Sequence, residues 1–483
     1  KFIIPDTKSL TVTGNLTNYG GNAGLVINSS ASGTGCLIHN SGDVPGTVNR
    51  YFTGSAESWH LISSPVYGQT ITGDFTPTGS YGDGTGYDLY AWYESSGVWV
   101  NYKNSTVSPT WTLVNGNNNF APIRGYLASY QAANPTKAFA GLMNSGAVSI
   151  SLSKFGTGTY AGYNLFGNPY PSPIDWKASG GWIRSYLVNN GGGYDISIWN
   201  NTDGNYGVYN SASISDNGTH GATRYIPVGQ GFFVKASAGA QPFGMDNDVR
   251  VSQNPAFLKS SEELSNVLRL RVTGTANTYS DEAIIEFGHE NATGGGTKLF
   301  SMYTTAPSLY ITKAGEDYSI DFRGEPASMN IPLNFIAGVD GSYTLTASQF
   351  ETFSQGTVIT VEDLKELRTQ VLTQNPVYTY NALTTDDHTR FVLHFGGTFS
   401  TGDIKDQNPL NLYTSGNKVY IAGTSGQALS GDVFVYNLMG QQLHQQKLSG
   451  GSLSEISLNV STGYYIVKMV TDRQTLTSKV FIK

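Results

Sequence analysis

Short runs of alternating apolar and polar residues, separated by Gly, Asn and Ser, recur along the chain. In residues 267–272 (VLRLRV), for example, Leu268 and Leu270 would face a core while the two arginines face solvent. Runs of this length with turn residues between them predict many short strands. Residues 362–372 have a helix-like composition, but strand-like segments flank them and an Asn-Pro pair follows, so we expect a strand, a turn and a second strand. The pattern therefore predicts an all-β protein.

Residues 1–50 contain only short apolar triplets between their turn residues, such as LVI at 25–27 and CLI at 36–38. Triplets of this kind are typical of the rungs of a parallel β-solenoid, and the alternative is an irregular β-meander. We predict the terminal rungs of a solenoid here. Because the chain starts at Lys1 without an initiating Met or a signal peptide, we expect a processed form or a fragment of a longer protein.

Residues 51–245 contain an internal repeat. Three blocks recur in the same order and at nearly constant spacing: WHLISSPV at 59–66 with YNLFGNPY at 163–170, YDLYAW at 87–92 with YDISIW at 194–199, and GYL at 125–127 with GFF at 231–233. We therefore predict two related β units, at 51–150 and 151–245. Asp88 and Asp195 occupy matching positions, and we expect each to anchor a turn through hydrogen bonds from its side chain to the backbone.

Three aromatic residues of the first unit are the best candidates for ligand binding. Tyr93, Trp99 and Tyr102 lie around a Ser-Ser-Gly turn at 95–97, where exposed rings would stack on the apolar face of a sugar. Trp99 and Tyr102 have aromatic counterparts in the second unit, however. Packing between neighbouring strands is therefore the competing interpretation of these rings.

Residues 246–400 continue the alternating pattern through several further strands. Together with the two repeat units, they predict a series of β-sandwich modules of the jelly-roll or Ig-like type. Residues 401–410 are polar and lack apolar periodicity, so they are the predicted linker. Residues 411–483 return to short alternating strands and predict a small β-sandwich at the C-terminus.

Four sequence motifs occur in order in the tail: VYNLMGQQL at 435–443, LSGG at 448–451, GYYIVKM at 463–469 and TSKVFIK at 477–483. In this order, and ending at the last residue, they resemble the type A C-terminal sorting domain of the Bacteroidetes type IX secretion system. The segments VITVEDL, VYTYNAL and RFVLHF upstream of the tail resemble an Ig-like module that often precedes it.

This resemblance implies export to the outer-membrane cell surface, with the type IX translocon and a surface sorting peptidase as partners. It also implies that the peptidase cleaves near the linker, between residues 398 and 412, and that the product is attached to lipopolysaccharide. Within the tail, the resemblance places the sorting signal at Gly440, Gly463, Tyr465, Lys479 and Val480.

Composition excludes several classes of protein. The chain has 28 Lys and Arg against 35 Asp and Glu, a net charge of −7, which argues against a nucleic-acid-binding protein. No apolar run reaches the roughly 18 residues of a membrane-spanning helix, so no transmembrane segment is expected. The single cysteine, Cys36, lies in an apolar strand, and we expect a buried structural thiol rather than a nucleophile.

No sequence motif for catalysis is present. The seven histidines form no HExxH pair, and there is no nucleophile elbow, P-loop or dinucleotide-binding motif. We therefore expect no catalytic residue and no enzyme, although a pair of glycosidase carboxylates would leave no signature in sequence spacing. Calcium is the one cofactor worth considering, because Asp residues cluster in three turns: Asp83 with Asp88, Asp246 with Asp248, and Asp386 with Asp387. None matches a calcium-binding motif, and we expect solvated turns and no metal site.

These observations predict the C-terminal part of a secreted cell-surface protein. Its β modules would act as an adhesin or as a display stalk for a region upstream of Lys1. The alternative is a carbohydrate-binding accessory region of a secreted glycoside hydrolase, with glycans as the ligand. Exposed coplanar rings would favour this alternative, and rings buried in cores would favour the adhesin. A third class is export cargo that keeps an uncleaved tail.

Overall fold

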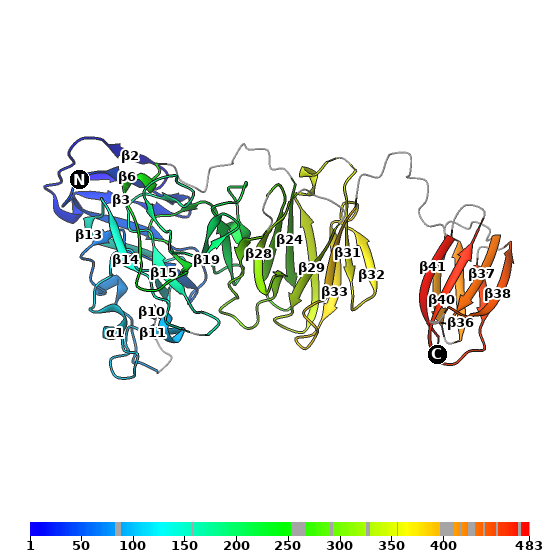
Figure 1. Cartoon of the computed structure of the whole chain (residues 1–483). Helices are drawn as coiled ribbons and strands as arrows, with labels where there is room; N and C mark the ends of the chain where they lie inside the picture. The colour runs from blue at the N-terminus through cyan, green and yellow to red at the C-terminus, as the bar shows by residue number, and fades with distance from the viewer. Residues whose placement is uncertain are drawn as a thin grey trace. The chain divides into compact units, whose positions relative to one another are not determined.

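The computed structural model describes residues 1–82, 88–156, 158–252, 266–289, 293–324, 329–354, 356–396, 410–415, 417–423, 430–437, 440–450, 453–471 and 475–482. They belong to two compact units, Lys1–Thr398 and Phe399–Lys483. Both units are built from strands, which confirms the all-β prediction (Figure 1). The boundaries predicted at 50, 150 and 245 lie within the first unit. Apart from Leu410, the predicted linker lies outside the described residues, as does most of the predicted cleavage region.

The first strands of the chain pair in parallel. β1 (Phe2–Ile4), β3 (Leu25–Ile27) and β7 (Pro45–Tyr51) form one ladder, β2 (Ser9–Val12) pairs with β6 (Cys36–His39), and β4 (Ser29–Ser30) forms a short antiparallel pair with β5 (Gly33–Thr34). β7 also pairs antiparallel with β13 (Thr136–Met143), which pairs in turn with β9 (Val66–Tyr67). Because the parallel ladder continues into an antiparallel sheet, the solenoid stays a prediction.

The two repeat units form sheets with the same strand order. In the first sheet the order is β8 (Trp59–Ile62), β12 (Tyr126–Ser129), β10 (Leu89–Tyr93) and β11 (Val98–Asn101); in the second it is β15 (Tyr163–Gly167), β22 (Gly231–Lys235), β19 (Gly193–Asn200) and β20 (Asn205–Asn210). The registers match as well, since Trp92 is paired with Trp99 in the first sheet and Trp199 with Tyr206 in the second. Shorter elements complete the two units: α1 (Trp111–Asn115), β14 (Val148–Ser151), β16 (Ile174–Asp175), β17 (Trp182–Ile183), β18 (Asn189–Asn190), β21 (Tyr225–Ile226) and β23 (Pro242–Met245).

The two sheets pack against each other through one face each. Alternate residues of every strand point to this interface. They form one shared aromatic layer, made of Trp59, Leu61, Trp92, Trp99 and Leu127 from the first sheet and Tyr163, Leu165, Trp199, Tyr206 and Phe233 from the second. The intervening residues point to the opposite faces, where each unit has a core of its own. The aromatic positions repeated in the sequence therefore meet in a single layer.

Matching positions of the two units also contact each other reciprocally. The backbone N–H of Ser63 donates to the carbonyl of Gly229 at 3.0 Å, and the N–H of Gly167, which matches Ser63, donates to the carbonyl of Ile123 at 2.8 Å. Two isolated β-bridges repeat this exchange: Ile62 with Gln230, and Phe166 with Arg124. Reciprocal contacts of this kind define an isologous interface, so the two units pack as a pseudo-symmetric pair within one chain.

The expectation that Asp88 and Asp195 anchor a turn through side-chain to backbone hydrogen bonds is wrong for the described residues, where the one backbone donor is the N–H of the distant Thr297, which donates to Asp195 at 3.1 Å. Asp88 instead accepts a hydrogen bond from the Asn101 side chain at 2.9 Å and pairs with Lys103 at 2.8 Å, both on the chain that follows across the hairpin. Asp195 accepts from the Asn210 side chain at 2.7 Å and from the Thr297 hydroxyl at 2.8 Å. The reason is that both Asp side chains lie opposite the end of a neighbouring strand, which offers donors that a sequence pattern does not reveal.

Residues 266–396 form one 11-stranded sheet. Its spatial order is β32 (Arg368–Val371), β31 (Val358–Asp363), β34 (Phe391–Gly396), β29 (Met329–Ile336), β27 (Ser308–Lys313), β28 (Glu316–Phe322), β25 (Ser280–Glu286), β24 (Val267–Gly274), β30 (Gly341–Ser348) and β33 (Val377–Ala382), with β26 (Gly295–Thr297) paired to β28. β31 and β32 confirm the strand, turn and strand expected at 362–372. Leu268 and Leu270 lie in the core of this sheet, as their alternation predicts. Because β25 and β28 pair in parallel and all ladders join into one sheet, the Ig-like sandwich stays a prediction.

The C-terminal unit contains two antiparallel sheets. One has β35 (Leu410–Ser415), β36 (Lys418–Gly423) and β39 (Leu453–Ser457), and the other has β38 (Gln442–Ser449), β37 (Ser430–Tyr436), β40 (Gly463–Val470) and β41 (Thr475–Ile482). Apolar residues from both sheets share one core, among them Val419, Val435 and Val467. For a unit this small, nearly every inward position has to be apolar.

Candidate functional site

A cleft of about 530 Å³ opens into the aromatic layer between the repeat units. This volume lies within the range of about 300–1,000 Å³ that is usual for small-molecule sites. Its walls come from three parts of the first unit: Trp59, Trp92 and Trp99 from one repeat, Tyr163 and Phe233 from the other, and Leu299 and Met302 from the segment before β27. The cleft therefore exists only when all three parts are folded together.

The rings in this cleft meet edge to face. Trp99 lies 5.0 Å from Trp92 at an interplanar angle of 67°, and 5.9 Å from Phe233 at 72°. The indole N–H of Trp92 donates to the carbonyl of Tyr163 at 2.6 Å. Among the described residues, the indole N–H groups of Trp59 and Trp99 have no hydrogen-bond partner. Edge-to-face packing gives a cohesive apolar wall, and these two N–H groups remain able to donate to a ligand.

The structure separates the three predicted binding residues. Trp99 lines the cleft, but Tyr93 and Tyr102 pack against the core on the opposite side of the sheet. The Tyr102 ring lies edge-on to Trp111 at 5.0 Å, and its hydroxyl donates to the carbonyl of Ile71 at 3.3 Å. The sequence pattern missed Trp59 and Trp92. Trp92 and Trp99 lie on either side of a tight turn, however, and this spacing could have predicted that they pair across two neighbouring strands.

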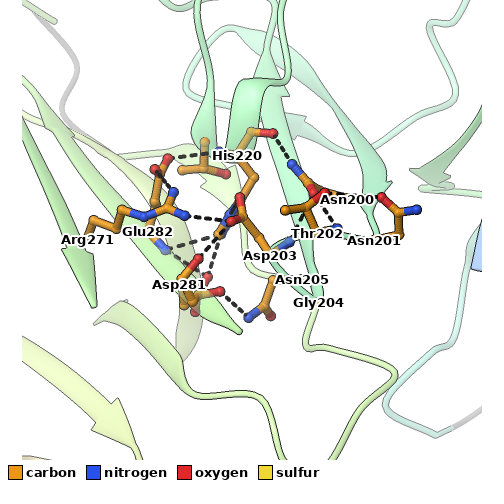
Figure 2. Close-up of polar contacts among 12 residues, drawn as sticks. Asn200, Asn201, Thr202, Asp203, Gly204, Asn205, His220, Arg271, Asp281 and Glu282 are labelled. Carbon is orange, nitrogen blue, oxygen red and sulfur yellow. Dashed lines mark hydrogen bonds and ion pairs between the residues drawn. The ribbon is translucent and has the colours of Figure 1, made fainter. Parts of the chain in front are cut away.

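A buried cluster of charged side chains lies apart from this cleft, centred on His220 (Figure 2). The His220 ring contacts Asp203 through Nδ1 at 2.8 Å and Asp281 through Nε2 at 2.9 Å. Its backbone N–H donates to Glu282 at 2.8 Å. Asp203 lies between β19 and β20 of the second repeat and His220 follows β20, whereas Asp281 and Glu282 lie on β25. The cluster therefore ties the second repeat unit to the 11-stranded sheet.

Three cations complete this cluster. Arg271 contacts Asp203 at 2.5 Å and Glu282 at 2.7 Å, Arg269 contacts Glu282 at 2.6 Å, and Lys298 pairs with Asp281. Every carboxylate near the imidazole thus has a cationic partner besides His220. The His220 side chain is fully buried, so it is out of reach of a substrate.

Hydrogen bonding controls the protonation of these groups. Burial alone would lower the pKa of His220, but hydrogen bonds to Asp203 and Asp281 raise that pKa above its ordinary value. Burial opposes ionisation of Asp203 and Asp281 as well, yet their hydrogen bonds and nearby positive charges hold both carboxyl pKa values below the usual range. These shifts favour the charged form of His220 between two ionised carboxylates, which is an arrangement for holding two elements together.

The other residues considered in the sequence have local structural partners. Asp246 accepts from the backbone N–H of Asp248 at 2.9 Å and caps a short 3₁₀-helix, and Asp386 pairs with Lys365 at 2.6 Å; Asp83 lies outside the described residues. In the part of the chain that the structure describes, no three His, Cys, Asp or Glu residues are arranged to hold a metal ion. Cys36 is buried, as predicted, and burial raises the pKa of its thiol to about 11.

The predicted sorting-signal residues all lie in the C-terminal unit. Gly440 has a φ of 83°, which favours glycine, and Gly463 begins β40. Tyr465 and Val480 are paired across β40 and β41 and are buried in the core, and the Tyr465 hydroxyl donates to the carbonyl of Ser461 at 2.6 Å. Lys479 is paired with Ile466 in the same ladder. These placements show how the residues serve the fold of the unit.

Two family descriptions match the sequence. "Domain of unknown function (DUF8693)" matches residues 1–395, and "Secretion system C-terminal sorting domain" matches residues 415–483. The first match covers more than half of the chain, so the chain belongs to that family. The second confirms the predicted sorting domain: the protein is a substrate of the type IX secretion system of Bacteroidetes and interacts with its machinery. It is exported to the cell surface or secreted.

The remaining comparisons add little. No curated protein matches the sequence. One solved structure, "Biofilm associated protein - BSP domain", is similar at 8% sequence identity, over 90% of this chain and 92% of that chain, with a TM-score of 0.14. At this score the similarity carries no argument about fold or function. Within the described residues, no helix is long and apolar enough to cross a membrane.

Proposed function

We propose that the Lys1–Thr398 unit is a ligand-binding adhesion module, delivered to the cell surface by the sorting domain, and that it is not an enzyme. The supporting observation is that binding groups and acid–base groups occupy different places. The open cleft offers aromatic rings, and its described lining residues include no carboxylate, histidine, lysine or arginine. The His220 cluster has such groups, but they are buried and paired with each other. A cleft whose described titratable lining residues are tyrosines alone suits retention of a ligand rather than its conversion.

A second candidate is a carbohydrate-binding accessory region of a secreted glycoside hydrolase. The unpartnered indole N–H groups of Trp59 and Trp99 favour it, because they would donate to sugar hydroxyls while the rings cover apolar C–H groups. The edge-to-face rings favour the adhesion module instead, since no flat platform is formed for a long glycan chain. The two candidates differ in what they retain: a glycan on another cell, or a soluble polysaccharide.

The test is a glycan-array screen of the full chain, followed by a cell-adherence assay and a polysaccharide pull-down. Trp99→Ala removes one wall of the cleft, and we expect it to weaken binding at least about tenfold. Tyr19→Ala is the matched control, because that ring is 96% exposed and lies outside the cleft. Equal binding by Trp99→Ala would reject the cleft as the binding site. We also propose that no metal is needed, so a chelator should change neither binding nor the melting temperature.

A further inference from the structure

A second cleft, of about 490 Å³, lies between the N-terminal strands and the second repeat unit. Its lining includes the hydroxyl and amide side chains of Ser30, Ser32, Asn201 and Thr202. Among its described lining residues there is no Asp or Glu, although the whole chain carries a net charge of −7. Two lining residues contact carboxylates that do not line the cleft: the Ser30 hydroxyl donates to Asp6, and the His220 ring contacts Asp203 and Asp281. This cleft is therefore a local exception in an acidic protein.

Arg50, on β7, supplies a positive charge to this cleft. Its Nη1 donates to the Thr34 hydroxyl at 3.2 Å, and its guanidinium lies 5.5 Å from the centre of the Phe52 ring. Its Nε is buried and has no acceptor. Within the described part of the chain, no carboxylate pairs with Arg50. Most of its hydrogen-bonding capacity is therefore unused by the protein.

Several other arginines that are partly or fully buried in this unit pair with carboxylates, whereas Arg124, Arg184 and Arg250 have no carboxylate partner among the described residues. Arg224 contacts Asp175 at 2.6 Å, Arg269 contacts Glu282 at 2.6 Å, and Arg390 contacts Asp363 at 2.7 Å. Leaving a buried charge without a partner costs free energy. Burial accordingly lowers the pKa of Arg50 to about 10, which still leaves it protonated at neutral pH. A ligand that supplied the missing negative charge would recover this cost.

The neighbours of Arg50 add positive potential or stay neutral. Lys137 is paired with Arg50 across the ladder of β7 and β13. His60 lines the same cleft, and burial, together with the charge of Arg50, lowers its pKa to about 4. His60 is therefore neutral under ordinary conditions. His220 also lines the cleft, but its side chain has no exposed surface and is paired with Asp203 and Asp281, so Arg50 remains the lining cation without a carboxylate partner.

We propose that this cleft binds the acidic group of a saccharide, a carboxylate or a sulfate, and that Arg50 is the residue that holds it. A guanidinium matches an oxyanion through two parallel hydrogen bonds. The surrounding hydroxyl and amide groups suit the hydroxyls of a sugar ring, and the volume exceeds what a small inorganic ion would fill. This proposal does not rest on the aromatic cleft: Trp59 and His60 are neighbours on β8, and successive residues of a strand point to opposite faces.

The experiment measures binding of three oligosaccharides of equal length to the full chain by calorimetry: one carrying carboxylates, one carrying sulfates and one neutral. Arg50→Gln removes the charge, Arg50→Lys keeps it without the planar fork, and Arg124→Gln is the matched control. Arg124 also has a buried Nε without an acceptor, but it lines a different cleft. We expect at least one acidic oligosaccharide to bind the wild type more tightly than the neutral one. Arg50→Gln should weaken that binding at least about tenfold, and Arg124→Gln should leave it unchanged.

The outcomes separate a binding role from a structural one. Because glutamine buries no charge, Arg50→Gln without ligand should melt no lower than the wild type. If Arg50→Gln does not fold, Arg50→Lys decides: binding weakened several-fold supports the proposal, and unchanged binding overturns it. Equal binding of acidic and neutral oligosaccharides, or full binding by Arg50→Gln, also overturns it. Trp99→Ala leaves this cleft intact, so failure here and failure of the aromatic cleft are distinguishable.

Discussion

The imidazole of His220 makes the stability of the first unit depend on pH. Burial lowers its pKa, but the hydrogen bonds to Asp203 and Asp281 outweigh burial and raise it above the ordinary value of 6.5. A group whose pKa is higher in the folded than in the unfolded chain contributes its full stability below the unfolded value. That contribution is lost as the pH rises through the folded value. We therefore expect the melting temperature to fall in thermal melts as the pH rises above the ordinary histidine pKa of 6.5.

A matched variant isolates this effect. His220 has φ 50° and ψ 33°, a conformation that Asn tolerates well, so His220→Asn removes the imidazole without straining the backbone. Arg271 and Lys298 still pair the two carboxylates in the variant, and we expect a loss of roughly 3 kcal/mol below pH 6. The variant should melt at a nearly constant temperature over the same pH range. The same decline in both proteins would contradict the assignment.

The pair Trp99 and Tyr206 tests whether matching positions are equally important for stability. Tyr206 is 3% exposed and lies edge-on to Trp199 and Phe233, so Tyr206→Ala should cost about 3–5 kcal/mol in urea unfolding. Trp99 is only partly buried because the cleft opens beside it, so Trp99→Ala should cost about half as much. Equal costs would mean that Trp99 is an ordinary core residue and not the wall of an open cleft.

At the scale of single residues, the sequence predicted some environments and missed others. Cys36 was predictable because its strand is apolar, and Leu268 because alternation along its strand predicts which side chains are buried. The partners of Asp195 and His220 were not, since Thr297 and Asp281 come from distant segments whose approach depends on tertiary packing. Trp99 lines the cleft, and its role in binding stays a prediction; Tyr93 and Tyr102 were grouped with it by closeness in sequence rather than by strand face.

At the scale of elements, the contact between the last residue of β15 and the residue that follows β8 depends on one glycine. A Cβ on Gly167 would lie 2.2 Å from Cβ of Ser63, its matching position in the other repeat. Gly167→Ala should therefore destabilise the protein by about 1–3 kcal/mol or more, because the two sheets would be forced apart. The double variant Ser63→Gly with Gly167→Ala removes the clash, since the next contact is the Gln230 carbonyl at 3.2 Å.

Urea unfolding of both single variants and the double variant checks this prediction. We expect a coupling free energy of about 1 kcal/mol or more in favour of the double variant. Simple additivity would mean that Ser63 and Gly167 do not pack against each other.

The repeat itself was predictable from three sequence blocks in one order. The face-to-face packing of its two copies was not, because the blocks do not reveal that equivalent residues meet.

At the scale of the whole molecule, the sequence predicted more of the structure of the tail than of the first unit. The tail has contiguous motifs, so its strands and its sorting role followed from local sequence. The Lys1–Thr398 unit depends on contacts such as His220 with Asp281, which are 61 residues apart, and the sequence pattern divided it into separate modules. Both clefts described above lie between segments that are distant in sequence, and neither has a local motif.

The division into two compact units leads to a prediction about export. Deletion of residues 411–483 should trap the protein inside the cell envelope, because the sorting domain is what the secretion machinery recognises. The truncated chain should keep the melting temperature of the first unit, since that unit has its own cores. Cell fractionation with protease treatment of intact cells measures display, and thermal melts of the purified truncated chain measure folding.

Two point variants show whether export requires a folded tail. Tyr465→Phe removes only the hydrogen bond to Ser461, worth about 1 kcal/mol, and should be displayed normally. Tyr465→Ala empties a core position of the tail and should cost about 3–5 kcal/mol there, enough to unfold so small a unit and abolish display. Normal display of Tyr465→Ala with an unfolded tail would mean that the machinery reads a linear segment. Normal display of the truncated chain would mean that export does not depend on this domain.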